Sequence, residues 1–107
     1  METRQIPTYG TRFSITEKDI EIARATLYIM TNDLHQEPFG FIENVFVQPN
    51  YQGQGYGTQI IQAVIEQARE SGCYKLICIS RYKKDKVHKW YKRLGFEDHG
   101  LEFRINL

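Results

Sequence analysis

A glycine-rich turn between a strongly apolar strand and an amphipathic helix constrains this chain more than any other feature of its sequence. Residues 40–47, Gly-Phe-Ile-Glu-Asn-Val-Phe-Val, predict a strand, and Pro49 ends it. Gly53, Gly55 and Gly57 then alternate with polar or aromatic residues. The next apolar residues recur at helical spacing: Ile60, Ile61, Val64, Ile65 and Ala68. The sequence therefore predicts a strand–turn–helix unit in which glycine lets the backbone approach a ligand closely.

The remaining segments predict a mixed α+β domain. Residues 13–30 alternate as a hairpin, residues 74–79 form a strand, and a short helix begins at Asp85. From Phe96 onward, apolar residues alternate as in one or two final strands: Leu101, Phe103, Ile105 and Leu107. The expected order is β-β-β-α-β-α-β in a single domain, residues 1–107. Strand 40–47 is expected to be apolar on both faces, with Ile42 and Phe46 on one side and Phe41, Val45 and Val47 on the other.

Composition excludes several classes of protein. The chain has 107 residues, of which 41% are hydrophobic and 13% aromatic, enough for a core of its own. Its net charge of +1 excludes a strongly basic, histone-like protein. No apolar run reaches the ~20 residues of a membrane span. Cys73 and Cys78 fit no zinc spacing. We expect a cytoplasmic protein with no metal and no membrane partner.

The glycine turn has a defined chemical meaning when a helix follows it directly. Free N–H groups in the first helical turn, together with the positive end of the helix dipole, favour an anion such as phosphate. The sequence does not match the two common phosphate-binding patterns. No Gly-Lys-Ser/Thr follows the turn, and Gly57 comes one residue too early for the dinucleotide fingerprint. A purely structural turn remains an alternative.

Two motifs resemble the GNAT family of N-acetyltransferases. Gln52, Gly55 and Gly57 match the family's acetyl-CoA-binding pattern Gln/Arg-x-x-Gly-x-Gly/Ala. Downstream, Trp90-Tyr91-Lys92-Arg93-Leu94-Gly95-Phe96 is similar to the family's Phe-Tyr-Glu-Lys-Leu-Gly-Phe. Together the two motifs cover about residues 40 to 107, at a spacing that fits the family.

The resemblance implies a mostly antiparallel sheet that splays around an acetyl-CoA site. Peptide groups near Phe46 and Val47 would polarise the thioester carbonyl where strand 40–47 leaves strand 76–79. Tyr91 matches the tyrosine that protonates the departing thiolate, and Lys84 replaces a pantetheine-binding asparagine of many members. Backbone amides from the turn would hold the pyrophosphate of the coenzyme: Gln52, Gly53, Gln54, Gly55, Tyr56, Gly57 and Thr58.

The front of the chain departs from the family pattern. Members usually begin with a strand and two helices that form one wall of the acceptor site, whereas about 39 residues precede the signature strand here. The acceptor pocket is therefore expected to be open or completed by a second subunit, which makes a homodimer the expected assembly.

The two candidate catalytic residues also have structural interpretations. Tyr91 could serve only in packing, beside Trp90 and Leu94. If it is catalytic, nearby cations are expected to lower its pKa toward that of a thiol. Glu43 is expected to be buried, and burial would raise its pKa and suit a general base. Glu43 could equally bind the amine of the substrate or lie at a solvent-exposed edge of the sheet.

Charge is divided along the chain. Residues 81–93 carry seven basic residues and one acidic residue, and residues 14–44 carry six acidic and two basic ones. The basic run could steer the 3′-phosphate of the coenzyme, and the acidic half would suit an amine acceptor. The leading hypothesis is an N-acetyltransferase in which a primary amine attacks acetyl-CoA directly in a ternary complex. The alternatives are a non-catalytic acyl-CoA-binding module and, less favoured, a nucleic-acid-binding module that leaves the glycine turn unexplained.

Overall fold

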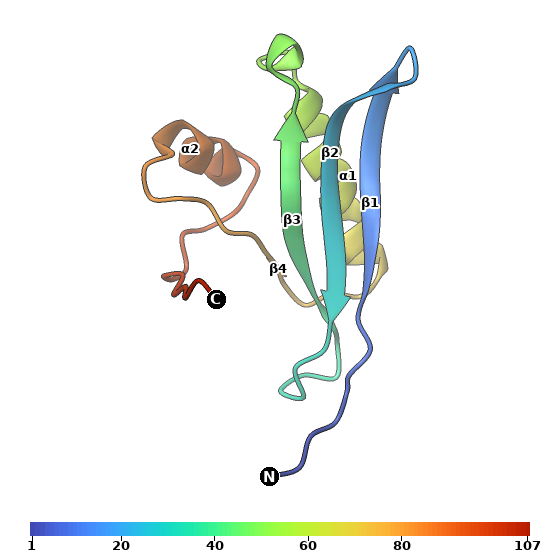
Figure 1. Ribbon diagram of the computed structural model, residues 1–107, viewed down its shortest axis with the longest axis vertical. Helices are drawn as coiled ribbons and strands as arrows, with labels where there is room; N and C mark the ends of the chain where they lie inside the picture. Colours follow the sequence, from blue (N-terminus) through green and yellow to red (C-terminus); the bar gives the residue numbers. More distant parts are fainter.

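The fold is a four-stranded sheet with one long helix on one face and a short helix beyond its edge (Figure 1). The computed structural model describes residues 1–107. Its elements, in chain order, are β1 (Tyr9–Glu17), β2 (Ile20–Met30), β3 (Phe39–Val47), the 3-10 helix η1 (Pro49–Tyr51), α1 (Tyr56–Glu70), β4 (Leu76–Ile77) and α2 (Asp85–Arg93). The strands lie in the order β1-β2-β3-β4; the first three are antiparallel, and β4 runs parallel to β3. The predicted α+β class is confirmed.

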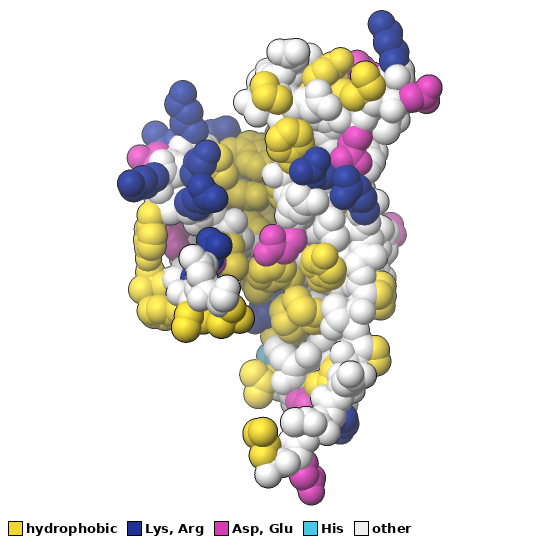
Figure 2. Space-filling view, in the orientation of Figure 1, with side chains coloured by type: hydrophobic (Ala, Val, Ile, Leu, Met, Phe, Trp, Pro, Cys, Tyr) yellow, Lys and Arg dark blue, Asp and Glu magenta, His cyan; other side chains and the backbone are white.

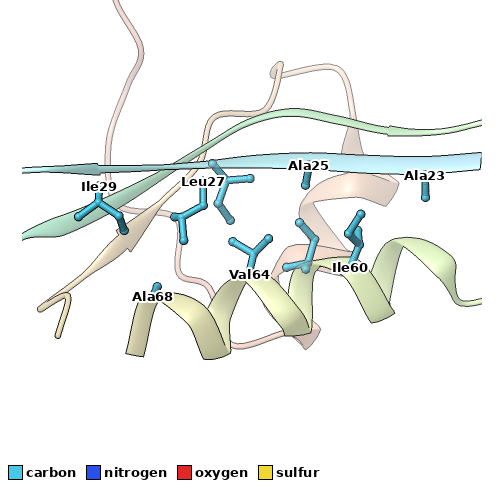
Figure 3. Packing of buried hydrophobic residues seen from close by; sticks show 9 residues of the cluster. Ala23, Ala25, Leu27, Ile29, Ile60, Val64 and Ala68 are labelled. Atoms are coloured by element: carbon cyan, nitrogen blue, oxygen red, sulfur yellow. The ribbon is translucent and has the colours of Figure 1, made fainter. Parts of the chain in front are cut away.

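The core lies between β2 and α1 (Figure 3). Alternate residues of β2 point toward the helix, as the period of two in a strand requires. These residues are Ala23, Ala25, Leu27 and Ile29. The facing residues of α1 are those whose helical spacing marks the sequence: Ile60, Ile61, Val64 and Ala68. Small alanines on β2 allow the helix to pack closely, and this contact fixes the orientation of the glycine turn that precedes α1.

A bulge in β3 overturns the predicted faces of that strand. Between the pairs Thr26↔Glu43 and Arg24↔Phe46, β3 holds one more residue than β2, and Asn44 adopts a positive φ of 58°. An extra residue reverses the alternation of side chains. Ile42 before the bulge is therefore buried in the core, and Val45 and Val47 after it pack against the same core. Phe46, predicted to share the face of Ile42, lies on the other face and is 40% exposed.

The predicted divergence of β3 and β4 is present. The two strands pair only at Gly40↔Leu76 and Phe41↔Ile77, although the sequence predicted a strand over residues 74–79. From Ile42 onward, β3 has no partner on this side. The chain after β4 turns away to α2, which lies apart from the sheet in Figure 1.

The final strand predicted from residue 96 onward is absent. Residues 96–107 contain no helix or strand, and the alternating apolar side chains are largely exposed: Leu101, Phe103, Ile105 and Leu107. A strand needs a neighbouring backbone to pair with, and β4 offers only two residues before it leaves the sheet. No helix of this fold is both long enough and apolar enough to cross a membrane.

Replacing Ile61 with alanine should cost about 2–5 kcal/mol of unfolding free energy, because Ile61 is fully buried between α1 and β2. Ile20 is 57% exposed, so Ile20→Ala is the matched control and should change stability by less than about 0.5 kcal/mol. Urea unfolding followed by circular dichroism measures both variants. Equal losses would contradict the placement of the core.

Candidate active site

A cleft of about 690 Å³ opens where β3 and the chain after β4 part. Figure 2 shows this hollow, with hydrophobic side chains at its floor and Lys and Arg side chains around its upper rim. One wall is the second half of β3 and the other comprises residues after β4 and residues of α2. The cleft brings together three residues named from the sequence: Glu43, Lys84 and Tyr91.

Glu43 lines the cleft but is exposed. It precedes the bulge residue Asn44 and pairs across the sheet with Thr26, on the face away from α1. The expectation that Glu43 is buried is therefore wrong, because this face of β3 is not covered by another layer in the structure. Its carboxylate is open to the cleft and to water, which is compatible with accepting a proton or binding an ammonium group.

Tyr91 lies on the inner face of α2 and is 9% exposed. Its ring contacts Trp90, with centroids 4.8 Å apart, and meets Phe96 edge-on at 5.4 Å. Burial, and to a lesser degree the neighbouring Cys78, raise the pKa of Tyr91 well above its usual value. The expectation that cations lower this pKa is wrong, because desolvation dominates. The phenol stays protonated over the physiological range and is a permanent hydrogen-bond donor.

Cys78 lies beside Tyr91 and packs against the core, as its apolar sequence context suggests. Burial raises the pKa of the Cys78 thiol to about 11, and the hydrogen bond from Tyr91 offsets only part of that rise. A protonated thiol is a poor nucleophile. The structure therefore places no activated cysteine at the cleft.

The glycine turn leads into α1 with its amide groups unpaired. No N–H from Gly53 to Thr58 donates to a backbone carbonyl or a side chain, and the first residue before the helix, Gly55, provides no side-chain cap. Gly53 and Gly55 have φ of 76° and 90°, and a Cβ on either would meet nothing within 4 Å. Both glycines are thus required by the left-handed backbone rather than by crowding within the chain. Unpaired amides at the positive end of a 15-residue helix fit an anionic group such as a pyrophosphate.

Side chains of the turn brace it from within. The side-chain amide of Gln52 donates to the carbonyl oxygen of Val47 at 3.0 Å, and that of Gln54 donates to the carbonyl of Asn50 at 3.1 Å. The hydroxyl of Tyr56 donates to Glu17 at the β1–β2 turn, 3.1 Å away, and this bond raises the pKa of Tyr56. The turn is therefore tied to β1 and β3.

Trp90 links the turn to the cleft, a role that sequence reasoning missed. Its indole N–H donates to the hydroxyl of Thr58 at 2.9 Å, and a Cβ at Gly57 would lie 3.3 Å from the Trp90 ring. Gly57 thus leaves room for the close approach of the Trp90 ring, in addition to any role toward a ligand. The signal in the sequence was a glycine within the first turn of α1 and a lone tryptophan on the inner face of α2.

The other predicted residues lie at the rim of the site. Phe46 and Val47 end β3 on the stretch that β4 does not pair, so their peptide groups border the splay. Lys84 is exposed at the start of α2, and its backbone amide donates to the carbonyl of Arg81. His88 bonds the same carbonyl through Nε2 at 2.7 Å. This pair of contacts shapes the loop that carries the basic residues into α2.

Comparison with known proteins identifies the family. The acetyltransferase (GNAT) family matches residues 5–96, and the chain belongs to this family. A glucosamine 6-phosphate N-acetyltransferase of Trypanosoma brucei brucei is 40% identical over 68 residues, which cover 64% of this chain and 44% of that protein. The chain thus spans less than half the length of this curated relative.

Solved structures share the fold. A putative acetyltransferase from Agrobacterium tumefaciens str. C58 has a TM-score of 0.84 and 34% identity, over 92% of this chain and 69% of its own. The aminoglycoside N-acetyltransferase AAC(6')-Iy, solved in complex with CoA, has a TM-score of 0.72 over 90% of this chain and 75% of its own. Its identity of 24% relates the two by fold.

The Trp90–Thr58 hydrogen bond should couple α2 to α1 measurably. Trp90→Phe keeps an aromatic ring, and Thr58→Val keeps the shape of the side chain, but each removes the bond. The double variant should therefore lose less stability than the sum of the single variants, with a coupling of about 1 kcal/mol. Thermal unfolding of the four proteins completes the cycle, and strict additivity would show that the bond contributes nothing.

Proposed function

We propose that this chain transfers an acetyl group from acetyl-CoA to a primary amine, by direct attack of the amine in a ternary complex. Membership of the acetyltransferase family supports the reaction class. The single observation that carries the proposal is the juxtaposition of unpaired amides at α1 with a cleft that Glu43 and Tyr91 line.

The amides of Gly53–Thr58 are proposed to bind the pyrophosphate of acetyl-CoA. Six N–H groups without partners in the chain, at the start of a helix, supply hydrogen bonds and a favourable dipole together. The unpaired stretch of β3 up to Phe46 and Val47 offers peptide groups to the pantetheine arm and to the thioester carbonyl. Arg81 and Lys84 at the rim are positioned to attract a further phosphate.

Glu43 is proposed to act on the nitrogen of the acceptor, and Tyr91 is proposed to act on the sulfur that leaves. The co-substrate supplies the acetyl group as a thioester, which the amine converts to an amide with release of the thiol. Glu43 would take a proton from the ammonium form of the substrate, so that the neutral amine can attack, or hold that amine in place; the proton that nitrogen loses as the amide forms balances the departing thiolate, which leaves as the thiol. Tyr91 would turn its one hydroxyl proton from Cys78 to the coenzyme sulfur as negative charge develops there. Its raised pKa keeps the donor protonated, so its main contribution is stabilisation of that charge.

The acceptor is proposed only as a class, a primary amine. The names of the relatives specify glucosamine 6-phosphate for one and an aminoglycoside for another, and both substances carry amines. The cleft carries carboxylates at Glu43 and Glu102, which suit a cationic acceptor. Arg104 also lines the cleft and would oppose a polycation.

A non-catalytic acyl-CoA-binding module is the second candidate. The observation that favours it is the exposure of Glu43, which lacks the buried environment expected of a strong general base. Both candidates bind acetyl-CoA, and only the enzyme releases free thiol when an amine is added. A panel of amines with acetyl-CoA, read by a thiol reagent, distinguishes them.

Gly55→Ala should weaken acetyl-CoA binding at least about tenfold, because a side chain at this positive φ disturbs the amides of the turn. Gly72→Ala is the matched control: Gly72 also has a positive φ, 77°, with nothing within 4 Å, but lies at the other end of α1. Each variant should lose roughly 1 kcal/mol of stability through the strained backbone. Calorimetry measures the affinity for acetyl-CoA. If both variants bind acetyl-CoA equally well, the turn does not bind the pyrophosphate.

Tyr91→Phe should lower kcat by ~10²–10³, or about 2.7–4 kcal/mol, because it deletes the hydroxyl that stabilises the charge developing on sulfur and keeps the ring. The affinity for acetyl-CoA should be unchanged, since the ground-state thioester needs no proton. Because the pKa of Tyr91 is raised above 10.0, the wild-type rate should not decline through Tyr91 ionisation below about pH 10. Stopped-flow and pH–rate measurements test both points. Wild-type turnover in the variant would leave Tyr91 with a packing role.

A further inference from the structure

Arg24 on β2 reaches across the sheet to the bulge in β3. Its Nε donates to Oδ1 of Asn44 at 3.1 Å, and its guanidinium carbon lies 4.5 Å from the centre of the Phe46 ring. The side chain therefore contacts β3 on both sides of Val45. Arg24 itself is not among the residues that line the cleft.

Asn44 is the residue that makes the bulge, and it requires support. Its φ of 58° is in the left-handed region, which costs free energy for any residue except glycine, although asparagine tolerates it better than most. The bulge has two consequences for the site. It lets Val45 and Val47 enter the core while Glu43 lies on the opposite face at the cleft, and it sets the direction of β3 beyond its last pair with β4.

A network across three strands holds Arg24 in turn. Glu21 on β2 lies 3.6 Å from an Arg24 nitrogen. The same carboxylate accepts hydrogen bonds from Arg12 at 2.6 Å and from Ser14 at 2.7 Å, both on β1. These bonds, first from Ser14 and then from Arg12, lower the pKa of Glu21 and keep it charged. The Arg24 guanidinium is thus fixed between an ionised carboxylate, an amide oxygen and an aromatic face.

We propose that Arg24 is a positioning residue for the acetyl transfer, acting through Asn44. By holding Asn44 in the left-handed conformation, Arg24 sets where the Glu43 carboxylate and the unpaired peptide groups of β3 lie in the cleft. This inference rests on the proposed function. It assigns a residue outside the cleft to the geometry of the reaction, and it predicts a loss of kcat that is much larger than any loss of acetyl-CoA affinity.

Arg24→Met is the test, because methionine retains an apolar stem over Phe46 but donates no hydrogen bond. We expect kcat to fall roughly ten- to a hundredfold, the cost of a small misplacement of reacting groups. Acetyl-CoA affinity should fall much less than kcat, since the amides of Gly53–Thr58 that are proposed to bind the pyrophosphate are untouched and only the β3 groups near the acetyl end move. Arg69→Met is the control: Arg69 forms an exposed ion pair with Glu66 on α1, and its loss should leave kcat unchanged. An unchanged kcat in Arg24→Met would overturn the proposal.

A second comparison tests whether the effect passes through Asn44. Glycine adopts a positive φ freely, so in the Asn44→Gly background the protein no longer needs the Arg24 hydrogen bond to keep residue 44 in the left-handed conformation. Arg24→Met should therefore lower kcat much less in that background than in the wild type. An equal loss in both backgrounds would show that Arg24 acts by another route and would overturn the proposal.

Amide chemical shifts separate this proposal from the proposed function. In Arg24→Met, and not in Arg69→Met, the backbone amides of residues 43–47 should shift while those of Gly53–Thr58 do not. If the wild type acetylates no amine, the proposed function fails, and the shifts still show whether Arg24 holds the bulge. If the amides of residues 43–47 do not shift in a folded Arg24→Met protein, Arg24 does not hold Asn44 in its conformation, and the proposal is overturned.

Discussion

The parting of β3 and β4 after two residue pairs is the constraint on which the rest of the site depends. Along its other edge β3 pairs with β2 as far as Val47, its last residue, with one bulge at Asn44, so the strand is held on one side and free on the other. An unpaired strand edge normally attracts another strand. Here the free edge faces a cleft, and the backbone N–H and C=O groups that would pair with a neighbouring strand are available to a ligand.

The core contact of α1 with β2 makes this opening stable. Because Ile60, Ile61 and Val64 pack in the core that β2 forms with α1, most of the contacts of the helix lie away from the stretch where the sheet splays. The start of α1 is therefore fixed relative to the end of β3, to which the side chain of Gln52 in the turn is hydrogen-bonded. Trp90 then joins α2 to this start through Thr58, so the wall that carries Tyr91 is tied to the turn that is proposed to hold phosphate.

The polar face of the sheet shows how a strained residue can be kept in a functional strand. Asn44 pays for its left-handed backbone in conformational free energy, and the contacts with Arg24 and its partners offset that cost. In return, the extra residue turns Val45 and Val47 toward the core, while Glu43 before the bulge stays on the opposite face at the cleft. The homodimer and the cytoplasmic location stay predictions.

Local signals in the sequence were sufficient for much of this fold. The spacing of Ile60, Ile61, Val64 and Ala68 determined the buried face of α1, because a helix presents every third or fourth residue to one side. The glycines determined the turn, because Gly53 and Gly55 adopt a backbone that other residues resist. The same local signals failed for residues 101–107, where alternation alone predicted a strand and the partner backbone was missing.

Contacts between distant segments decided the rest. The bulge at Asn44 depends on Arg24, 20 residues earlier in the chain, so a simple period of two misplaced Phe46. The exposure of Glu43 depends on the absence of a second layer over that face, and the raised pKa of Tyr91 depends on its burial beside Cys78. The sequence by itself determined which residues are apolar, flexible or ionisable. Only the tertiary structure decided which of them lose water and which face one another, because desolvation and pairing are properties of the assembled surfaces.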